Sequence, residues 1–291
     1  MLARNFTDIL ALANSIAREQ DTSTRSVVRE LIQYEILNAL LEMDVLQTLT
    51  FQGGTALHLS YNEMRFSEDL DFVGGINFDP HIMDEFELAL SQKIGQRYSL
   101  AVTVKPRIGA TGIATWKAII RIPDSNRANK QSEMIQIEVA NIPAYTRNTQ
   151  KRIHTLTRDL ETVYTSLFVP VESLEEIAAD KVIAFGVRRY VTYRDIWDLW
   201  GLSDRNLDRV QVSNLIQKKL SDYRIDLNQF TVSTSARLKE MSTHYYQKKF
   251  TAEMERFVYG TVRRMLDDRD TVVSIIEQAK SLVSTYLAPT P

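Results

Sequence analysis

The sequence predicts an α+β protein in which a sheet domain with flanking helices is followed by a helical C-terminal domain. Strand-like and helix-like segments alternate across residues 46–142, which is the order typical of a sheet packed against helices. From Ser173 onward the pattern becomes helical. We therefore expect a first domain over 1–165, with helices at its N-terminus, and a second, helical domain over 166–291.

The composition is that of a soluble globular protein. The 291 residues are 44% hydrophobic and 25% charged, and a chain of this length can bury a substantial core. The formal net charge of −2 provides no global positive field toward nucleic acid. The absence of cysteine excludes disulfides, thiolate metal sites and cysteine nucleophiles, and the four scattered histidines disfavour zinc. We find no signal peptide or membrane-spanning pattern, so we expect a cytoplasmic protein with no membrane partner.

Periodicity predicts the elements of the first domain. The N-terminal part contains, in chain order, helices at 5–20 and 24–44, an apolar segment at 46–51, a helix at 55–61 and a strand at 65–73. The remainder contains a helix at 79–96 and strands at 99–107, 114–122 and 134–142, with a polar loop at 123–132. Alternation is clearest in the last strand, where Gln136 and Glu138 lie on the face opposite three β-branched residues.

Capping signals predict the first helices of the second domain. Ser173 and Glu176 have the spacing of a capping box, which opens a helix to about residue 190. Thr192 resembles a second cap, and Gly201 is expected to end that helix. Further helical segments are expected at 208–221, 232–250, 252–267 and 270–286.

The most informative local pattern is a Gly53-Gly54-Thr55 turn followed by Asp69 and Asp71. Alternate residues of a strand point to one face, so both aspartates can bind the same pair of Mg²⁺ ions. Glycines let the backbone approach a triphosphate closely. An isolated D-x-D is also compatible with a solvated strand edge, and the glycines with a simple strand-to-helix turn. Their combination favours a metal-dependent nucleotidyl-transfer site, because a cation relieves the repulsion of paired carboxylates.

Other charged residues have two interpretations each. Glu138 is either a third metal ligand or part of a solvated strand face. Lys181 lies within an apolar helix, where it either binds phosphate together with Arg188 or extends its ammonium to solvent. Asp195 and Asp198 are neighbours on the next helix. Asp195 occupies a capping position, and Asp198 is framed by apolar residues.

Two parts of the chain resemble one family. FQGGTALHL at 51–59 and RFSEDLDF at 65–72 look like the first motif of the AbiEii/AbiGii-type nucleotidyltransferase toxins. KVIA at 181–184, Arg188 and RDIWDL at 194–199 look like their later motifs. The resemblance implies a DNA polymerase β-like nucleotidyltransferase core followed by a helical domain.

The resemblance also implies roles for the motif residues. Gly53, Gly54, Thr55 and Ser67 would hold the nucleotide, while Asp69 and Asp71 would bind two Mg²⁺ ions. From the helical domain, Lys181 and Arg188 would contact the triphosphate, and Asp195 or Asp198 would be a later essential acid. Glu138 has no counterpart in a family motif.

The function implied is that of a toxin in a phage-defence type toxin–antitoxin system. Such an enzyme transfers NMP from an NTP to RNA, and the related MenT toxins act on the tRNA 3′ end and stop translation. Its partners would be NTP, tRNA and a cognate antitoxin. Two alternatives remain: a nucleotidyltransferase acting on a small molecule or a protein hydroxyl, and a non-catalytic member that binds a partner. Eight basic residues are candidates for an RNA-binding face: Lys218, Lys219, Arg237, Lys239, Lys248, Lys249, Arg263 and Arg264. A solvated helix surface explains the same residues.

Overall fold

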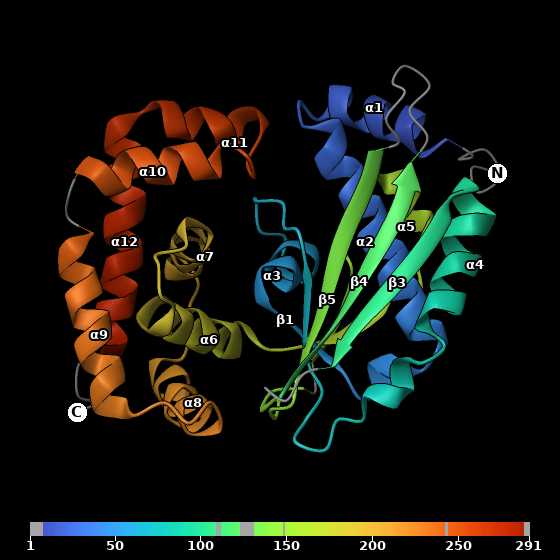
Figure 1. Cartoon of the computed structure of the whole chain (residues 1–291). Helices are drawn as coiled ribbons and strands as arrows, with labels where there is room; N and C mark the ends of the chain where they lie inside the picture. The colour runs from blue at the N-terminus through green and yellow to red at the C-terminus, as the bar shows by residue number, and fades with distance from the viewer. Residues whose placement is uncertain (1–7, 109–111, 123–130, 148, 242–243, 288–291) are drawn as a thin grey trace. The chain divides into compact units, whose positions relative to one another are not determined.

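The computed structural model describes residues 8–108, 112–122, 131–147, 149–241 and 244–287 (Figure 1). They form two compact units. The first unit comprises Met1–Asn62 and Phe66–Val171, and the second comprises Glu63–Arg65 and Glu172–Pro291. The chain therefore enters the second unit briefly at Glu63–Arg65 and leaves the first unit after Val171, whereas the sequence predicts a single boundary after residue 165.

A mixed sheet forms the centre of the first unit. Among the described residues it has seven strands in the order β3-β4-β5-β2-β1-β7-β6. β2 runs parallel to β5 and antiparallel to β1. The strands are β1 Thr50–Gln52, β2 Leu70–Val73, β3 Ala101–Ile108, β4 Ile113–Ile122, β5 Gln131–Ala140, β6 Thr149–Arg152 and β7 Phe168–Val171.

The apolar side chains on one face of this sheet form part of the core of the first unit. Leu70 and Phe72 of β2 lie in register with Ile137 and Val139 of β5, and all four side chains are fully buried. The ring of Phe72 stacks on Phe51 of β1 with centroids 5.1 Å apart. Since successive strand residues point to opposite faces, the residues between these positions lie on the other, polar face.

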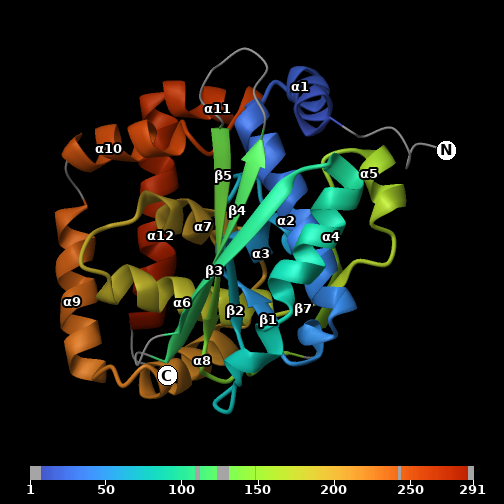
Figure 2. The same cartoon turned by 45° about the vertical axis from the view of Figure 1, so that its right-hand side comes forward.

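Helices cover the apolar face. α2 and α4 lie along the long strands, with α2 packing on β5 and α4 on β3 (Figures 1 and 2). α3 begins immediately after β1 and packs on β1 and β2. The helices of this unit are α1 Ile9–Glu19, α2 Thr24–Glu42, α3 Gly53–Tyr61, α4 Phe86–Tyr98 and α5 Arg158–Val163.

The second unit is helical, as the sequence predicts. α6 begins at the Ser173 cap, whose hydroxyl accepts the Glu176 backbone N–H at 3.3 Å. α7 packs against α6 and α12 (Figure 1). The helices are α6 Leu174–Val187, α7 Tyr193–Ser203, α8 Arg209–Asp222, α9 Leu227–Glu240, α10 His244–Met254, α11 Gly260–Arg264 and α12 Arg269–Leu287.

Several predicted boundaries are wrong. β2 begins at Leu70, five residues after the predicted start of that strand. Gly201 lies inside α7 instead of ending it, and its missing side chain has a packing reason, because a Cβ there would lie 2.6 Å from Glu63 Oε2. The helices predicted at 232–250 and 252–267 are instead α9, α10 and α11, and the sequence did not predict β6, α5 or β7. The predicted polar loop at 123–132 lies mostly outside the described residues.

Candidate active site

Polar residues line up across the open face of the sheet in the first unit. Asp71 lies in register with Gln52 of β1 and with Glu138 of β5. Glu138 in turn lies in register with Thr115 of β4. Register partners share a face and lie within side-chain reach, and Asp71 and Glu138 are both only partly buried. The two carboxylates that the sequence places in strands therefore face the same accessible surface.

Asp69 immediately precedes β2 and is held by two neighbouring segments. Its Oδ1 accepts the backbone N–H of Gln136 at 3.3 Å. Its carbonyl accepts the hydroxyl of Thr55 in α3. Because the Thr55 side chain is fully buried, its hydroxyl ties the first turn of α3 to the start of β2.

The glycine turn forms the first turn of α3. Gly53 has φ +78°, a conformation that L-residues other than glycine adopt at a cost. A Cβ at this position would lie 2.7 Å from Asp71 Oδ2. The turn therefore brings the backbone directly against the Asp71 carboxylate and leaves the N–H groups of the first helical turn for an anion.

Gly53→Ala should destabilise the protein by about 1–2 kcal/mol, because alanine is disfavoured at positive φ and its Cβ would displace the Asp71 carboxylate. The melting temperature measures this effect. Gly95→Ala in α4 is the matched control, since a Cβ there meets nothing within 4 Å. Helical glycine to alanine is stabilising by roughly 0.5–1 kcal/mol. Equal melting of the Gly53→Ala variant and wild type would contradict this account.

Side chains of α2 support the loop before Asp69. The Gln33 amide donates to the carbonyls of Ser67 at 3.1 Å and Glu68 at 3.3 Å, and Gln33 is itself buried. Arg29 binds Glu68 at 2.7 Å. These supporting residues were not predicted from the sequence. The sequence signal that could have identified them is the recurrence of polar residues within the otherwise apolar helix α2.

Lys181 lies in a buried ion-pair network of the second unit. Its ammonium contacts Asp195 Oδ1 at 2.9 Å and Asp198 Oδ2 at 2.6 Å. Only 8% of Lys181 is exposed, so the solvent-extended interpretation is wrong. Burial alone would lower the pKa of Lys181, but the two aspartates outweigh it and the pKa is raised.

Asp198 is held most tightly by Arg65. The guanidinium is bidentate, with Nε to Oδ1 at 2.5 Å and Nη2 to Oδ2 at 2.6 Å, and both residues are buried. Arg65 comes from the Glu63–Arg65 segment of the same unit. Buried bidentate pairs are geometrically specific, so Asp198 fixes the position of this segment.

Asp195 has a more accessible cationic partner. Arg188 Nη1 lies 2.5 Å from Asp195 Oδ2, and the Arg188 side chain is 49% exposed. Asp195 occupies the third position of α7, where an acid interacts favourably with the helix N-terminus. The capping position is therefore as the sequence suggests, while the carboxylate itself binds Lys181 and Arg188.

One basic residue proposed for an RNA-binding face does not belong to any surface. Lys219 is fully buried, and its ammonium contacts Glu172, Glu176 and Asp180 at 2.9, 3.0 and 2.6 Å. Burial tends to lower the pKa of Lys219, but the three acids raise it well above its usual value. Lys219 therefore neutralises buried acids of α6 and the residue before its cap.

The network should make the second unit sensitive to acid. Burial tends to raise the pKa of Asp198, but Arg65 and Lys181 lower it from 3.8 to about 2. The resulting stabilisation is complete above about pH 4 and is lost as the pH falls through about 2, amounting to about 2 kcal/mol. We expect Asp198→Asn to remove this part of the pH dependence. Denaturant unfolding of both proteins between these pH values measures it; parallel profiles would contradict it.

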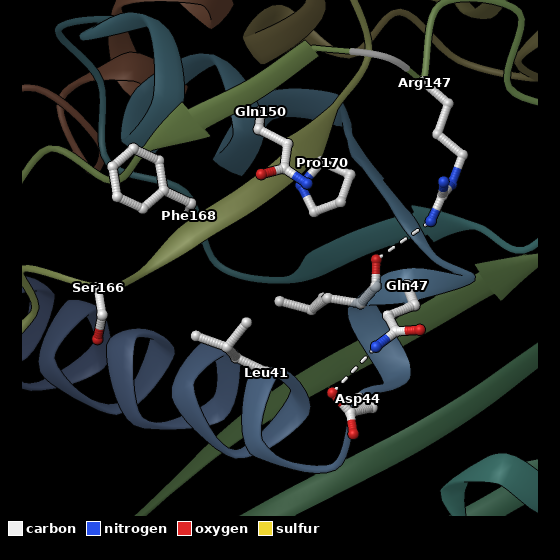
Figure 3. Close-up of a pocket in the computed structure, with 9 residues that line it drawn as sticks. Leu41, Asp44, Gln47, Arg147, Gln150, Ser166, Phe168 and Pro170 are labelled. Atoms are coloured by element: carbon white, nitrogen blue, oxygen red, sulfur yellow. Dashed lines mark hydrogen bonds between the residues drawn. The ribbon is translucent and has the colours of Figure 1, made fainter.

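A pocket elsewhere in the first unit contains none of the predicted site residues. It has a volume of about 460 Å³ and lies between the end of α2 and β6 and β7 (Figure 3). Two of its polar side chains are hydrogen-bonded within the lining: Gln47 Nε2 donates to Asp44 at 3.1 Å, and Arg147 donates to the Leu46 carbonyl at 3.3 Å. This pocket offers no carboxylate pair like that of Asp69 and Asp71.

Comparison with protein families matches residues 35–274 to the family described as Nucleotidyl transferase AbiEii toxin, Type IV TA system. The chain belongs to this family. It is thus a nucleotidyltransferase toxin of a type IV toxin–antitoxin system, and family membership implies an NTP substrate and a cognate antitoxin. The match includes the Gly53 turn, both aspartates and the Lys181 network, so the family predicted from the motifs is confirmed.

Solved structures show the same fold. MenT4, a nucleotidyltransferase toxin from Mycobacterium tuberculosis H37Rv, is similar with a TM-score of 0.60 and 19% identity, over 96% of this chain and 93% of that one. JHP933 from Helicobacter pylori is similar with a TM-score of 0.50 and 16% identity, over 90% and 93%. Comparison with curated protein sequences finds no match. The predicted α+β fold with a helical C-terminal region is therefore confirmed.

Proposed function

We propose that this AbiEii-family toxin transfers NMP from an NTP to an RNA hydroxyl, with the tRNA 3′ end as the acceptor. The observation that carries the proposal is the approach of the Gly53 backbone to the Asp71 carboxylate on the open sheet face. A first helical turn suited to phosphate therefore lies against a carboxylate suited to a cation. The acceptor oxygen bonds to the α-phosphorus, the bond to pyrophosphate breaks, and NMP remains on the RNA.

Magnesium fits the carboxylates on this face. Mg²⁺ is held by one or two protein carboxylates and completes its octahedron with water and substrate phosphates. Asp69 and Asp71 provide such a pair, with Glu138 in register beside Asp71. Within the described ranges no three His, Cys, Asp or Glu side chains gather as a metal-binding group. Bound Mg²⁺ would stabilise charge on the attacking and leaving oxygens.

The nucleotide-binding residues divide by accessibility. The backbone N–H groups of Gly53, Gly54 and Thr55 bind phosphate oxygens, while the Thr55 hydroxyl positions Asp69. Arg188 is half exposed, so we assign it the direct contact with the triphosphate. The Lys181 ammonium already pairs with Asp195 and Asp198. If Lys181 also contacts the triphosphate, its positive charge is shared between the two aspartates and the phosphate.

The helical unit has exposed cationic residues that are suited to binding RNA. Lys239, Lys248 and Lys249 are exposed, and neutralised phosphates give affinity that falls with salt. No helix in the described part of the chain has the length and apolarity needed to span a bilayer. A cytoplasmic location, where NTP and tRNA are available, is part of the proposal.

The deciding experiment is to incubate the purified protein with α-labelled NTPs, one at a time, with Mg²⁺ and total RNA, and to read which species gains label. Label in RNA of tRNA size supports the proposal. Label in protein or in a small molecule would favour the alternative acceptors. The absence of label in any species with every NTP would overturn the proposal. The Asp69→Asn/Asp71→Asn double variant controls for a contaminating transferase.

A further inference from the structure

A pocket of about 360 Å³ lies within the second unit, lined by the segment between α6 and α7, the end of α9 and the start of α10. Its volume is in the range of pockets that bind small ligands. Three tyrosines and three cationic residues line it: Tyr190, Tyr193, Tyr246, Arg189, Arg237 and Lys249. The roles described above use none of the three tyrosines.

The charge of the pocket is opposite to that of the whole chain. Three cationic side chains accompany a single acid, Glu240, among the described residues that line it, whereas the chain has a formal net charge of −2. Glu240 accepts the Tyr246 hydroxyl at 3.4 Å. Arg237 donates to the carbonyls of Phe185 and Arg188, so its guanidinium is fixed at the wall. The net positive charge suits a phosphodiester.

Tyr190 provides an exposed surface for stacking. Tyr190 is 69% exposed, and the guanidinium carbon of Arg189 lies 5.1 Å from its ring centroid. Tyr193 and Tyr246 have ring centroids 6.4 Å apart. Aromatic rings beside cations are the elements with which proteins bind unpaired bases.

The pocket is connected to the Lys181 network through one residue. The Arg188 side chain binds Asp195, and the Arg188 carbonyl accepts a hydrogen bond from the Arg237 guanidinium. Tyr193 is two residues before Asp195 in α7. A ligand in the pocket would therefore lie beside the cation that we assign to the triphosphate.

We propose that this pocket binds an unpaired base near the reacting end of the acceptor RNA. This inference rests on the proposed function and identifies where the helical unit contacts the acceptor. The base stacks on Tyr190, and Arg189 and Lys249 bind the adjacent phosphates. A paired base is excluded because its faces are covered by its neighbours in the helix. An acidic peptide would use the cations but not the exposed ring, so the tyrosines favour RNA.

Binding is measured directly with the full-length protein and a fluorescent five-nucleotide single-stranded RNA carrying a free 3′-hydroxyl. We expect Tyr190→Ala to weaken binding about tenfold or more, the scale of one lost stack, and Tyr190→Phe to bind like wild type. Lys249→Ala should reduce the salt dependence by about one unit of log–log slope. Lys105→Ala in β3 is the matched control, because Lys105 is an exposed lysine outside the pocket. Melting temperatures verify that each variant is folded.

Equal affinity of wild type and Tyr190→Ala, or binding of a duplex as tight as that of the single strand, would overturn the inference. Displacement of the RNA by free NTP with the same dependence on Tyr190 would assign the pocket to the nucleotide substrate instead. Displacement by an acidic peptide alone would make it a protein-binding site. If the pocket binds RNA as expected but label appears only on protein, the proposed function fails while the pocket stands.

Discussion

Asp71→Asn should abolish nucleotidyl transfer while leaving the melting temperature near that of wild type. Asparagine has nearly the same shape but lacks the charge that binds Mg²⁺, and it relieves repulsion from Glu138, the register partner of Asp71. A catalytic metal contributes several kcal/mol of transition-state stabilisation, so we expect a loss of about a hundredfold or more. Asp69→Asn should have the same effect. Transfer of labelled NMP to RNA measures the rate, and thermal melting measures the fold.

Graded variants of the same sheet face distinguish metal binding from general electrostatics. Glu138→Gln should retain transfer but require a higher Mg²⁺ concentration, if Glu138 is the third carboxylate. Lys117→Met, on the same face and in register with Gln136, should leave the Mg²⁺ requirement unchanged. A folded Asp69→Asn/Asp71→Asn double variant with undiminished transfer would exclude both aspartates as metal ligands.

The sequence predicted those parts of the fold that depend on local patterns. Strands 114–122 and 134–142 were found because one face of each is buried and the other is polar, so the period of two is visible in the residues themselves. The four-residue β6 and β7 are too short for such a pattern. Segment 65–69 was misassigned because Arg65 is buried by its pairing with Asp198, 133 residues later, and no local window contains that partner.

The same distinction applies to the candidate site. Gly53, Asp69 and Asp71 form one short motif, so spacing alone brought them together. Gln33 supports this loop from a different helix, which periodicity cannot show. Lys219 was wrongly included among surface cations because its three acidic partners lie along α6 and just before it. Whether such a lysine is exposed depends on tertiary packing, which composition does not contain.

Arg65→Met should destabilise the second unit by about 3–5 kcal/mol, because it leaves the buried Asp198 carboxylate without its bidentate partner. Denaturant unfolding measures this loss. Trp197 and Trp200 lie in α7 beside Asp198, so their fluorescence reports the second unit in a Trp116→Phe background. Arg263→Met is the matched control, because the Arg263–Glu255 pair is exposed and should contribute about 0–1 kcal/mol.

The cycle that combines Arg65→Met with Asp198→Asn tests whether the two residues act as a pair. The double variant should lose less than the sum of the single losses, by roughly 0.5–3 kcal/mol, because each single change already breaks the same contact.

Asp195 should behave differently from Asp198. Its partner Arg188 is half exposed, so Asp195→Asn should reduce transfer at temperatures where the protein stays folded, whereas Asp198→Asn should lose transfer and stability together. These assignments make Asp198 structural and Asp195 the later essential acid. Additive losses of stability at Arg65 and Asp198 would contradict the first assignment. Full transfer by a folded Asp195→Asn variant would contradict the second.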